Sequence, residues 1–300
     1  DIASFPVAGY LFFTDLIDLS EETLVRLTVH KCHRRLLKTQ ILQWQAVLSQ
    51  KEQKSFAPDS SNSAAALLNL CGNNMSENVK NIIITGASRG IGRSLVDVFH
   101  KQGHRVWALS RHISELSKLP GIQVASVDIT NEQQVKQWVA SCGDQSFDIL
   151  INNAGRLVNK PFVETTAEDF ENVYKVNVFG VANLIRNLYP LFSQKSHIVN
   201  ISSMGGINGT AKFPGLSAYS SSKGALGILT ELLAEEFKAE GPSVNALALG
   251  AVQTEMLEKA FPGYQAPLSA DQMASYIADF ALKGHHFYNG KVLPLSSSTP

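Results

Sequence analysis

The segment YSSSK, residues 219–223, places a phenol and an ammonium group four positions apart. In an α-helix such residues lie one above the other, so Lys223 would lie one turn from Tyr219 on the same face. A free phenol has a pKa of about 10 and is a reluctant base at neutral pH. A neighbouring cation favours the phenolate and lowers this pKa, so we expect Tyr219 to pass a proton to or from an alcohol oxygen.

A tyrosine and a lysine at this spacing are, by themselves, more often an exposed pair on a helix surface, so the pair needs elements that bring it into a site. From residue 79 onward, β-rich runs alternate with helical stretches. This alternation predicts an α/β fold: a single Rossmann-like, doubly wound parallel sheet of about seven strands with helices on both faces. Ligands bind such sheets outside the carboxyl ends of the strands. The expected strands cover residues 81–85, 104–110, 122–128, 147–152, 197–202, 243–249 and 290–295, and the expected helices cover 90–101, 131–141, 166–192 and 218–240.

The segment TGASRGIG, residues 85–92, follows the first expected strand and opens the first expected helix. Gly86, Gly90 and Gly92 allow a sharp turn and a close approach of the backbone to a ligand. The start of the helix directs free N–H groups and a partial positive charge outward, which suits a pyrophosphate. The segment therefore predicts a dinucleotide-binding site. The small serines of YSSSK would then leave room for a flat cofactor and a substrate.

This glycine pattern resembles that of the short-chain dehydrogenase/reductase (SDR) family. Further segments that resemble the family's motifs follow in the family's order, and together they cover about residues 79–295 of the chain. They are NNAG (152–155), VNVFG (176–180), HIVNISSMGG (197–206), YSSSK (219–223) and GAVQTEM (250–256).

The resemblance implies four catalytic residues. Tyr219 would exchange the proton, Lys223 would also hold the nicotinamide ribose, Ser203 would bond the substrate oxygen, and Asn177 would hold a water in the proton path. The implied reaction is reduction of a ketone or aldehyde to an alcohol by hydride transfer from NADP(H). The substrate could be a 3-oxoacyl thioester or one of many small carbonyl compounds. The alternative is a nucleotide-binding regulator that has kept the fold and lost turnover.

The residues after the second expected strand favour NADP(H) over NAD(H). A carboxylate there would bind the ribose hydroxyls and repel a 2′-phosphate. This chain has Ser110 followed by Arg111, and Arg89 could reach the same region from the glycine turn, although one arginine could be an ordinary surface charge. Guanidinium groups favour a phosphate. The resemblance completes the expected cofactor-binding set, which is Gly86, Ser88, Arg89, Gly90, Ile91, Gly92, Ser110, Arg111, Asp128, Ile129, Asn153, Ala154, Gly155, Tyr219, Lys223, Gly250, Val252 and Thr254.

Composition narrows the function classes. The 26 basic residues balance the 26 acidic ones, so the net charge gives no indication of a nucleic-acid partner. Three widely spaced cysteines argue against a disulfide scaffold and fit a reducing compartment, so we expect a cytoplasmic protein. No apolar run reaches the roughly 18 residues of a membrane span. The short apolar stretch at residues 7–13 lacks a preceding basic region, which argues against a secretory signal.

The first 74 residues have no counterpart in the family. Residues 20–54 predict a long helix with a basic middle, residues 55–63 a linker, and the next residues a shorter helix. We therefore expect a mainly helical extension over residues 1–74, either a true appendage or a segment dispensable for the catalytic unit, and an SDR domain over residues 75–300. The basic helix could present a solvated face or be a docking or membrane-surface helix. His30, Cys32 and His33 form a single cluster without a second ligand pair, which is weak support for zinc, so we expect no metal site.

Three departures from the family concern the substrate side. Ser203 and Tyr219 lie 16 positions apart, which indicates an insertion near residues 210–212 that would reshape the substrate rim. Leu249 replaces a common proline, and the short segment 255–269 predicts a small lid. We expect the substrate pocket to include Gly205, the inserted loop and residues near Met256. By resemblance alone, the chain would form a homodimer or homotetramer through its two long helices.

Overall fold

The computed structural model of the chain describes residues 79–296. The helix expected over residues 20–54, the linker over 55–63 and the cluster of His30, Cys32 and His33 lie outside the described residues. In the part that is described, no helix is both long and apolar enough to cross a membrane.

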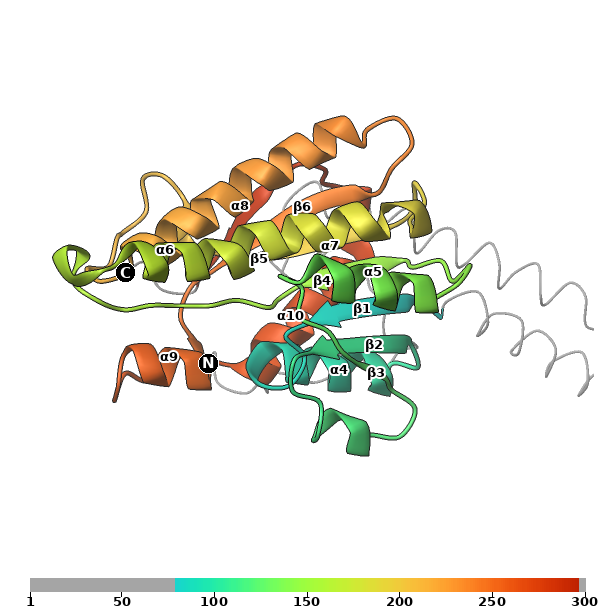
Figure 1. Cartoon of the computed structure of the whole chain (residues 1–300), viewed down its shortest axis with the longest axis horizontal. Helices are drawn as coiled ribbons and strands as arrows, with labels where there is room; N and C mark the ends of the chain where they lie inside the picture. Colours follow the sequence, from blue (N-terminus) through green and yellow to red (C-terminus); the bar gives the residue numbers. More distant parts are fainter. Residues whose placement is uncertain (1–78, 297–300) are drawn as a thin grey trace, which may run out of the picture. The chain divides into compact units, whose positions relative to one another are not determined.

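Seven parallel strands form one sheet within residues 79–296, which confirms the predicted α/β fold (Figure 1). The strand order is β3-β2-β1-β4-β5-β6-β9, so successive connections run in one direction from β1 and in the opposite direction from β4. This reversal leaves a crevice at the carboxyl ends of β1 and β4. The strands are β1 (Asn81–Thr85), β2 (Arg105–Ser110), β3 (Gln123–Ser126), β4 (Ile149–Asn152), β5 (His197–Ser203), β6 (Ser243–Leu249) and β9 (Val292–Leu295).

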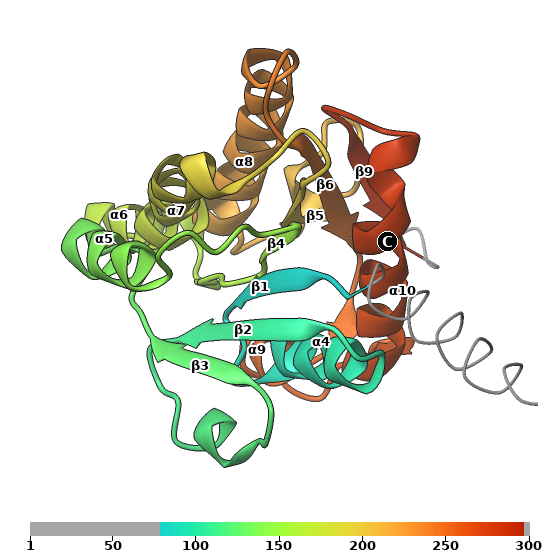
Figure 2. The ribbon, with the colours of Figure 1, turned by 90° about the vertical axis from the view of Figure 1, so that its right-hand side faces the viewer.

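Helices cover both faces of the sheet, as Figure 2 shows. Helices α4 (Gly90–Lys101) and α10 (Ala270–Lys283) lie on one face, and α5 (Glu132–Ser141), α6 (Ala167–Tyr174), α7 (Val181–Leu188) and α8 (Ser217–Glu236) lie on the other. Successive residues of a strand point to opposite faces. Ile82 and Ile84 accordingly pack with α4 and α10, whereas Ile83 packs with α7 and α8. Two-sided burial explains why β1 is a continuous apolar run rather than an alternating one.

The helix expected over residues 166–192 is divided by a π-helical segment. Thr166 and Asp169 form a capping box that starts α6. The π-helical segment η3 (Lys175–Gly180) then leads into α7, and a 3₁₀ turn, η4 (Tyr189–Leu191), ends the run. π-Helical turns within α-helices occur frequently at functional sites, and this one contains Asn177.

Shorter elements complete the described chain. They are the strands β7 (Val252–Gln253) and β8 (Leu268–Ser269), the helix α9 (Glu255–Ala260), and the 3₁₀ turns η1 (Leu116–Lys118), η2 (Phe162–Glu164), η5 (Met204–Gly206) and η6 (Gly284–His286).

A buried histidine, His197, begins β5 and so lies at the opposite end of this strand from its carboxyl end. His197 has no exposed surface. Its Nδ1 lies 2.9 Å from the carbonyl oxygen of Ala281, and Asn245 Nδ2 lies 3.0 Å from its Nε2. Nδ1–H can donate to the carbonyl while Nε2 accepts from the amide, an arrangement that suits the neutral ring. Burial lowers the pKa of His197 to about 4.

Folding stability should therefore fall when the pH drops from 6.5 to 4. In this window the unfolded chain binds a proton at residue 197 and the folded chain does not, so acid favours unfolding by about 3 kcal/mol over the whole window. Urea unfolding at pH 7, 5.5 and 4.5 should show a weaker pH dependence for His197→Gln than for the parent chain. The exposed His100, changed to Gln, is the control. Parallel pH dependences of the parent and His197→Gln would contradict this assignment.

Candidate active site

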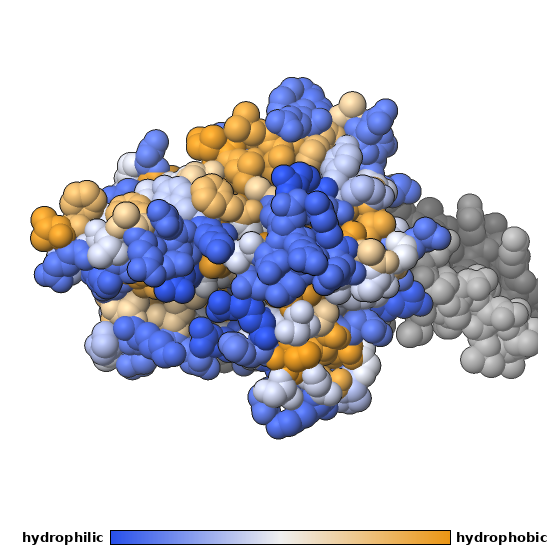
Figure 3. Space-filling view, in the orientation of Figure 1, coloured by the Kyte–Doolittle hydropathy of each residue, from blue (hydrophilic) through white to orange (hydrophobic). Residues whose placement is uncertain are grey.

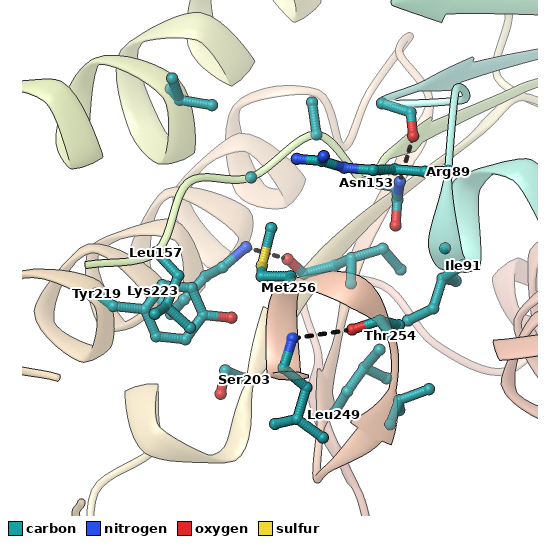
Figure 4. A pocket seen from close by; sticks show the side chains of 18 of the residues that line it. Arg89, Ile91, Asn153, Leu157, Ser203, Tyr219, Lys223, Leu249, Thr254 and Met256 are labelled. Atoms are coloured by element: carbon teal, nitrogen blue, oxygen red, sulfur yellow. Dashed lines mark hydrogen bonds between the residues drawn. The ribbon is translucent and has the colours of Figure 1, made fainter. Parts of the chain in front are cut away.

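A cleft of about 820 Å³ lies at the carboxyl ends of the parallel strands. Its walls come from the segments that follow β1, β2, β4, β5 and β6, as the strand order requires. Of the residues predicted to bind or react, all but Gly92 and Asn177 line this cleft. Figure 4 shows Tyr219, Lys223, Ser203 and Leu157 grouped at one side, Arg89, Ile91 and Asn153 at the other, and Met256 between the two groups.

The glycine turn has the shape of an anion-binding cradle. Gly86 and Gly90 have φ angles of +65° and +53°, which L-residues with side chains rarely adopt. A Cβ on Gly86 would lie 2.8 Å from the Cα of Ala154, so only glycine leaves this passage open. No side chain caps the start of α4, and its free N–H groups and positive dipole end therefore remain available for a phosphate. These observations fit a dinucleotide.

Gly92 has a packing role instead of a place in the cleft wall. A Cβ at this position would lie 2.3 Å from the carbonyl oxygen of Gly86 and 2.5 Å from Asn153 Nδ2. The absence of a side chain therefore lets α4 approach the turn that precedes it. Gly92 shapes the binding turn from behind, and the sequence pattern alone does not separate this role from direct contact.

Hydrogen bonds tie the end of β4 to the glycine turn. Asn153 Nδ2 donates to the carbonyl oxygens of Thr85 (3.0 Å) and Gly86 (3.2 Å). The hydroxyl of Thr85 accepts from the backbone N–H groups of Asn153 and Ala154, both at 3.0 Å. The side chain of Asn153 is therefore used to hold the turn, and sequence reasoning, which placed Asn153 in the binding set, gave no indication of this role.

The two arginines expected near the ribose have different surroundings. Arg111 lies in the cleft wall after β2, beside Ser110 and His112, and makes no ion pair within residues 79–296. Arg89 instead lies 3.5 Å from Glu255 at the start of α9. Of these two arginines, Arg111 therefore has the guanidinium that is not paired with a described carboxylate, whereas the guanidinium of Arg89 is paired with Glu255 of α9.

The phenol and the ammonium group of YSSSK meet in the cleft. Tyr219 and Lys223 lie on α8, and Lys223 Nζ is 5.7 Å from the centroid of the Tyr219 ring. Lys223 is only 4% exposed, and its Nζ donates to the carbonyl oxygen of Ile201, at 2.7 Å. The side chain of Ser203, at the end of β5, lies at the same side of the cleft as Tyr219 (Figure 4).

The predicted lowering of the Tyr219 pKa is wrong for this structure. Burial raises the pKa of Tyr219, and the side chain of Ser203 only partly opposes this shift. The ammonium of Lys223 bonds a backbone carbonyl rather than the phenol oxygen, and burial lowers the pKa of Lys223 to about 8. Desolvation disfavours both charged forms, so the phenol is held protonated.

The three serines also differ from the expectation. They do not line the cleft, so they do not make room for a flat cofactor. Ser222 Oγ donates to the carbonyl oxygen of Tyr219 (2.6 Å) and accepts from Asn177 Nδ2 (2.9 Å). Ser220 instead packs closely against Gly205, where an added Cβ would lie 2.7 Å from Ser220 Oγ.

Asn177 lies behind the cleft rather than in its wall. It is fully buried, and its Oδ1 accepts from the backbone N–H of Arg156 (2.8 Å) while its Nδ2 donates to the carbonyl of Arg156 (3.0 Å). Together with the bond to Ser222, these contacts join the π-helical segment, the segment after β4 and α8. This geometry suits a residue that positions the catalytic helix.

The wall after β6 is also held by side-chain contacts. Thr254 Oγ1 accepts from the backbone N–H of Leu257 (3.2 Å) and caps α9, and Thr254, Gly250 and Val252 line the cleft. Asp128 Oδ1 accepts from the N–H and the hydroxyl of Thr130, which fixes the loop after β3 next to Ile129.

Comparison with known proteins decides the family. The family model for short chain dehydrogenase matches residues 80–265. The chain belongs to the short-chain dehydrogenase family. Members of this family are oxidoreductases that use a nicotinamide cofactor, and the cradle described above fits such a group.

Similar proteins include reductases. An NADPH-dependent pterin aldehyde reductase of Arabidopsis thaliana is 35% identical over 204 residues, which cover 63% of this chain and 83% of that protein. Carbonyl reductase [NADPH] 2 of Sus scrofa is 35% identical over 181 residues, which cover 58% of this chain and 72% of that protein. The structure of ElxO with NADP bound is 28% identical, with a TM-score of 0.65, and the match covers 73% of this chain and 97% of that one.

In this short-chain dehydrogenase, the substrate side contains residues that sequence reasoning did not name. Gly205 and Met256 line the cleft as expected, and the loop between β5 and α8 contributes Phe213 and Leu216. The unexpected wall residues are Leu157, Met204, Leu257, Phe261 and Tyr264. The aromatic residue directly after the inserted segment was the available signal for Phe213. Nothing in the local pattern indicates the others, because they reach the cleft from separate loops.

Proposed function

We propose that this short-chain dehydrogenase reduces a ketone or aldehyde to an alcohol with NADPH, and that residues 75–300 form the catalytic domain while residues 1–74 are not needed for turnover. The observation that carries the proposal is that Ser203 and Tyr219 lie at the same side of a dinucleotide-type cleft, with the buried Lys223 one turn along α8. The names of the similar pterin aldehyde and carbonyl reductases support the same direction of reaction.

The roles of the residues follow from their protonation states. When bound, the nicotinamide nucleotide would supply the hydride for the carbonyl carbon. Burial holds Tyr219 protonated, which is the form that donates a proton to the developing alkoxide. Ser203 would donate a second hydrogen bond to the same oxygen. Lys223 would stabilise the phenolate left after proton donation, and Asn177 would position α8.

The glycine turn and the loops after β2, β3, β4 and β6 would hold the nucleotide. The N–H groups at the start of α4 would bind the pyrophosphate. The loop of Asp128 and Ile129 would contact the adenine, and Val252 and Thr254 would contact the nicotinamide side. The position of Arg111, without an ion pair in the part of the chain that is described, favours NADPH over NADH because a guanidinium binds a 2′-phosphate.

We also propose that two copies of the chain pair through α7 and α8, as a homodimer or within a homotetramer. Figure 3 shows an apolar patch over α8. Phe179, Ile228 and Leu232 remain 61%, 59% and 55% exposed, and a groove between α7 and α8 is lined by Tyr189, Leu229 and Phe237. Apolar surface of this kind is typical of an interface.

The low cysteine content fits a reducing compartment, so we propose that the protein is cytoplasmic. Cell fractionation can test this location.

Changing Tyr219 to Phe should lower kcat at least 10³-fold for any carbonyl substrate of the enzyme, because the proton donor is lost. The Kd for NADPH should change less than threefold, since the ring and its packing remain. Stopped-flow absorbance of NADPH and fluorescence titration measure the two quantities. If the parent chain binds NADPH but reduces none of a broad carbonyl panel, the protein is a nucleotide-binding regulator.

A chain of residues 75–300 should match the turnover of the full chain. A loss of turnover would contradict the proposal that residues 1–74 are dispensable.

Changing Arg111 to Ala should weaken NADPH binding about tenfold or more and leave NADH binding within twofold, since only NADPH carries the 2′-phosphate. The ratio of the two Kd values is the decisive quantity. Arg105→Ala, at the exposed start of β2, is the matched control and should leave the ratio unchanged. A parent chain that binds NADH more tightly than NADPH would refute the proposed cofactor preference.

Changing Leu232 to Asp should shift the protein towards monomers, because a carboxylate would be buried against the apolar face of the second copy. Sedimentation equilibrium measures the distribution. Val163→Asp is the control, since Val163 is 91% exposed but lies in η2, away from α8. A monomeric parent chain would exclude this assembly.

A further inference from the structure

The substrate end of the cleft has an apolar wall built from three separate segments. Leu157 comes from the segment after β4, Phe213 and Leu216 come from the loop between β5 and α8, and Met256 and Phe261 come from α9 and the residue after it. These residues lie in the same cleft as Ser203 and Tyr219. A substrate whose carbonyl oxygen reaches Ser203 and Tyr219 would therefore place its adjoining group against this wall.

Two aromatic rings form part of the wall. The rings of Phe213 and Phe261 meet edge to face, with centroids 6.3 Å apart and an interplanar angle of 65°. Phe213 nevertheless remains 43% exposed and Tyr264 47% exposed, although both line the cleft. Aromatic rings prefer edge-to-face or offset contacts with further rings. The exposed surface of these rings can therefore be covered by a flat ring of the substrate.

The wall is fixed by contacts between the three segments. Asn159 Nδ2 donates to the carbonyl oxygen of Ala260, at 2.7 Å, next to Phe261. The backbone N–H of Lys160 donates to the carbonyl oxygen of Gly215, at 3.0 Å, close to Phe213. A Cβ on Gly215, whose φ is +87°, would lie 2.0 Å from Asn159 Oδ1, so glycine is required for this approach. The two phenylalanines are thus held in position by the backbone around them, which reduces the entropy cost of binding.

The charged side chains that line the cleft either bond another group of the protein or lie at the end of the cleft away from the apolar wall. Arg89 pairs with Glu255, and Arg111, His112 and Asp128 follow β2 and β3. The ammonium of Lys223 bonds the carbonyl of Ile201.

Lys212 of the inserted segment does not line the cleft, and its ammonium donates to the carbonyl of Ile207 (2.6 Å) and to Thr210 Oγ1 (2.9 Å). Among the described residues of the apolar wall, a carboxylate or phosphate on the substrate would have no cationic partner, and burying it there would be costly.

From this wall we infer that the substrate carries an uncharged aromatic ring next to its carbonyl group, and that Phe213 and Phe261 determine this specificity. The inference rests on the proposed function, because it concerns the substrate of the same site. It also explains the inserted segment, which places Phe213 at the cleft instead of leaving a short, open rim.

Four 1,2-dicarbonyl compounds separate the effect of the ring from the effects of bulk and charge. The full-length chain with NADPH should reduce 1-phenyl-1,2-propanedione with a kcat/KM at least tenfold above that for 2,3-butanedione. The cyclohexyl analogue, 1-cyclohexyl-1,2-propanedione, should fall between the two because it has the bulk of a ring without its π-system. Benzoylformate, which keeps the phenyl ring but adds a carboxylate, should be at least tenfold poorer than the phenyl dione.

Phe213→Ala and Phe261→Ala should each raise the KM for the phenyl dione about tenfold, with a loss at least fivefold larger than that for butanedione. Phe213→Tyr, which keeps the ring, should restore most of the preference. Phe162→Ala is the control, since Phe162 is 68% exposed in η2 and does not line the cleft.

The outcomes separate the two levels of the argument. If NADPH binds but no dione is reduced, the proposed function fails and the inference falls with it. The function stands and the inference is overturned if the diones are reduced but the kcat/KM for butanedione or for the cyclohexyl dione equals that for the phenyl dione. The same holds if benzoylformate has the highest kcat/KM. A phenyl preference that survives both alanine substitutions would overturn the assignment to Phe213 and Phe261.

Discussion

The attachment of α8 to the end of β5 is the constraint on which the site depends. Lys223 Nζ donates to the carbonyl oxygen of Ile201, and Ser202 Oγ donates to the carbonyl of Lys223, at 2.7 and 3.0 Å. One residue of α8 is therefore bonded to β5 through both its side chain and its backbone. This double attachment sets the height of α8 against the sheet, and it brings Tyr219, one turn before Lys223, level with Ser203 at the strand end.

Two further contacts support the same junction. The backbones of η5 and α8 touch, since a Cβ on Gly206 would lie 2.7 Å from the backbone nitrogen of Gly224. Deeper in the fold, Asn152 of β4 donates to Asn200 of β5, which donates to Thr230 of α8, both at 2.9 Å. Hydrogen bonds between buried polar side chains favour one arrangement of the elements that carry them. This chain of side chains thus fixes α8 relative to two strands at once.

The two ends of the cleft are built on different physical principles. At the end with the glycine turn, backbone conformation gives the cleft its shape: glycines with positive φ, an uncapped helix start and a hydrogen bond from Asn153 to the carbonyl of Thr85. At the substrate end, side chains from three loops form the surface. The backbone-built end can be common to a family because all its members bind the same kind of dinucleotide. The side-chain-built end can change whenever a loop changes in length. The insertion predicted near residues 210–212, just before Phe213, would be an example of such a change.

The sequence by itself determined the sheet and the position of the cleft. Residue alternation predicted the parallel sheet, and all but two of the predicted site residues line the cleft, because such motifs are local and follow strand ends. Only the tertiary structure decided what depends on distant neighbours. Burial, rather than the charge of Lys223, dominates the pKa of Tyr219. Asn177 and Gly92 act from behind the cleft wall. Phe261 contacts Phe213 although the two residues lie 48 positions apart in the sequence. Burial and contacts between loops arise only when the chain is folded, so no local pattern encodes them.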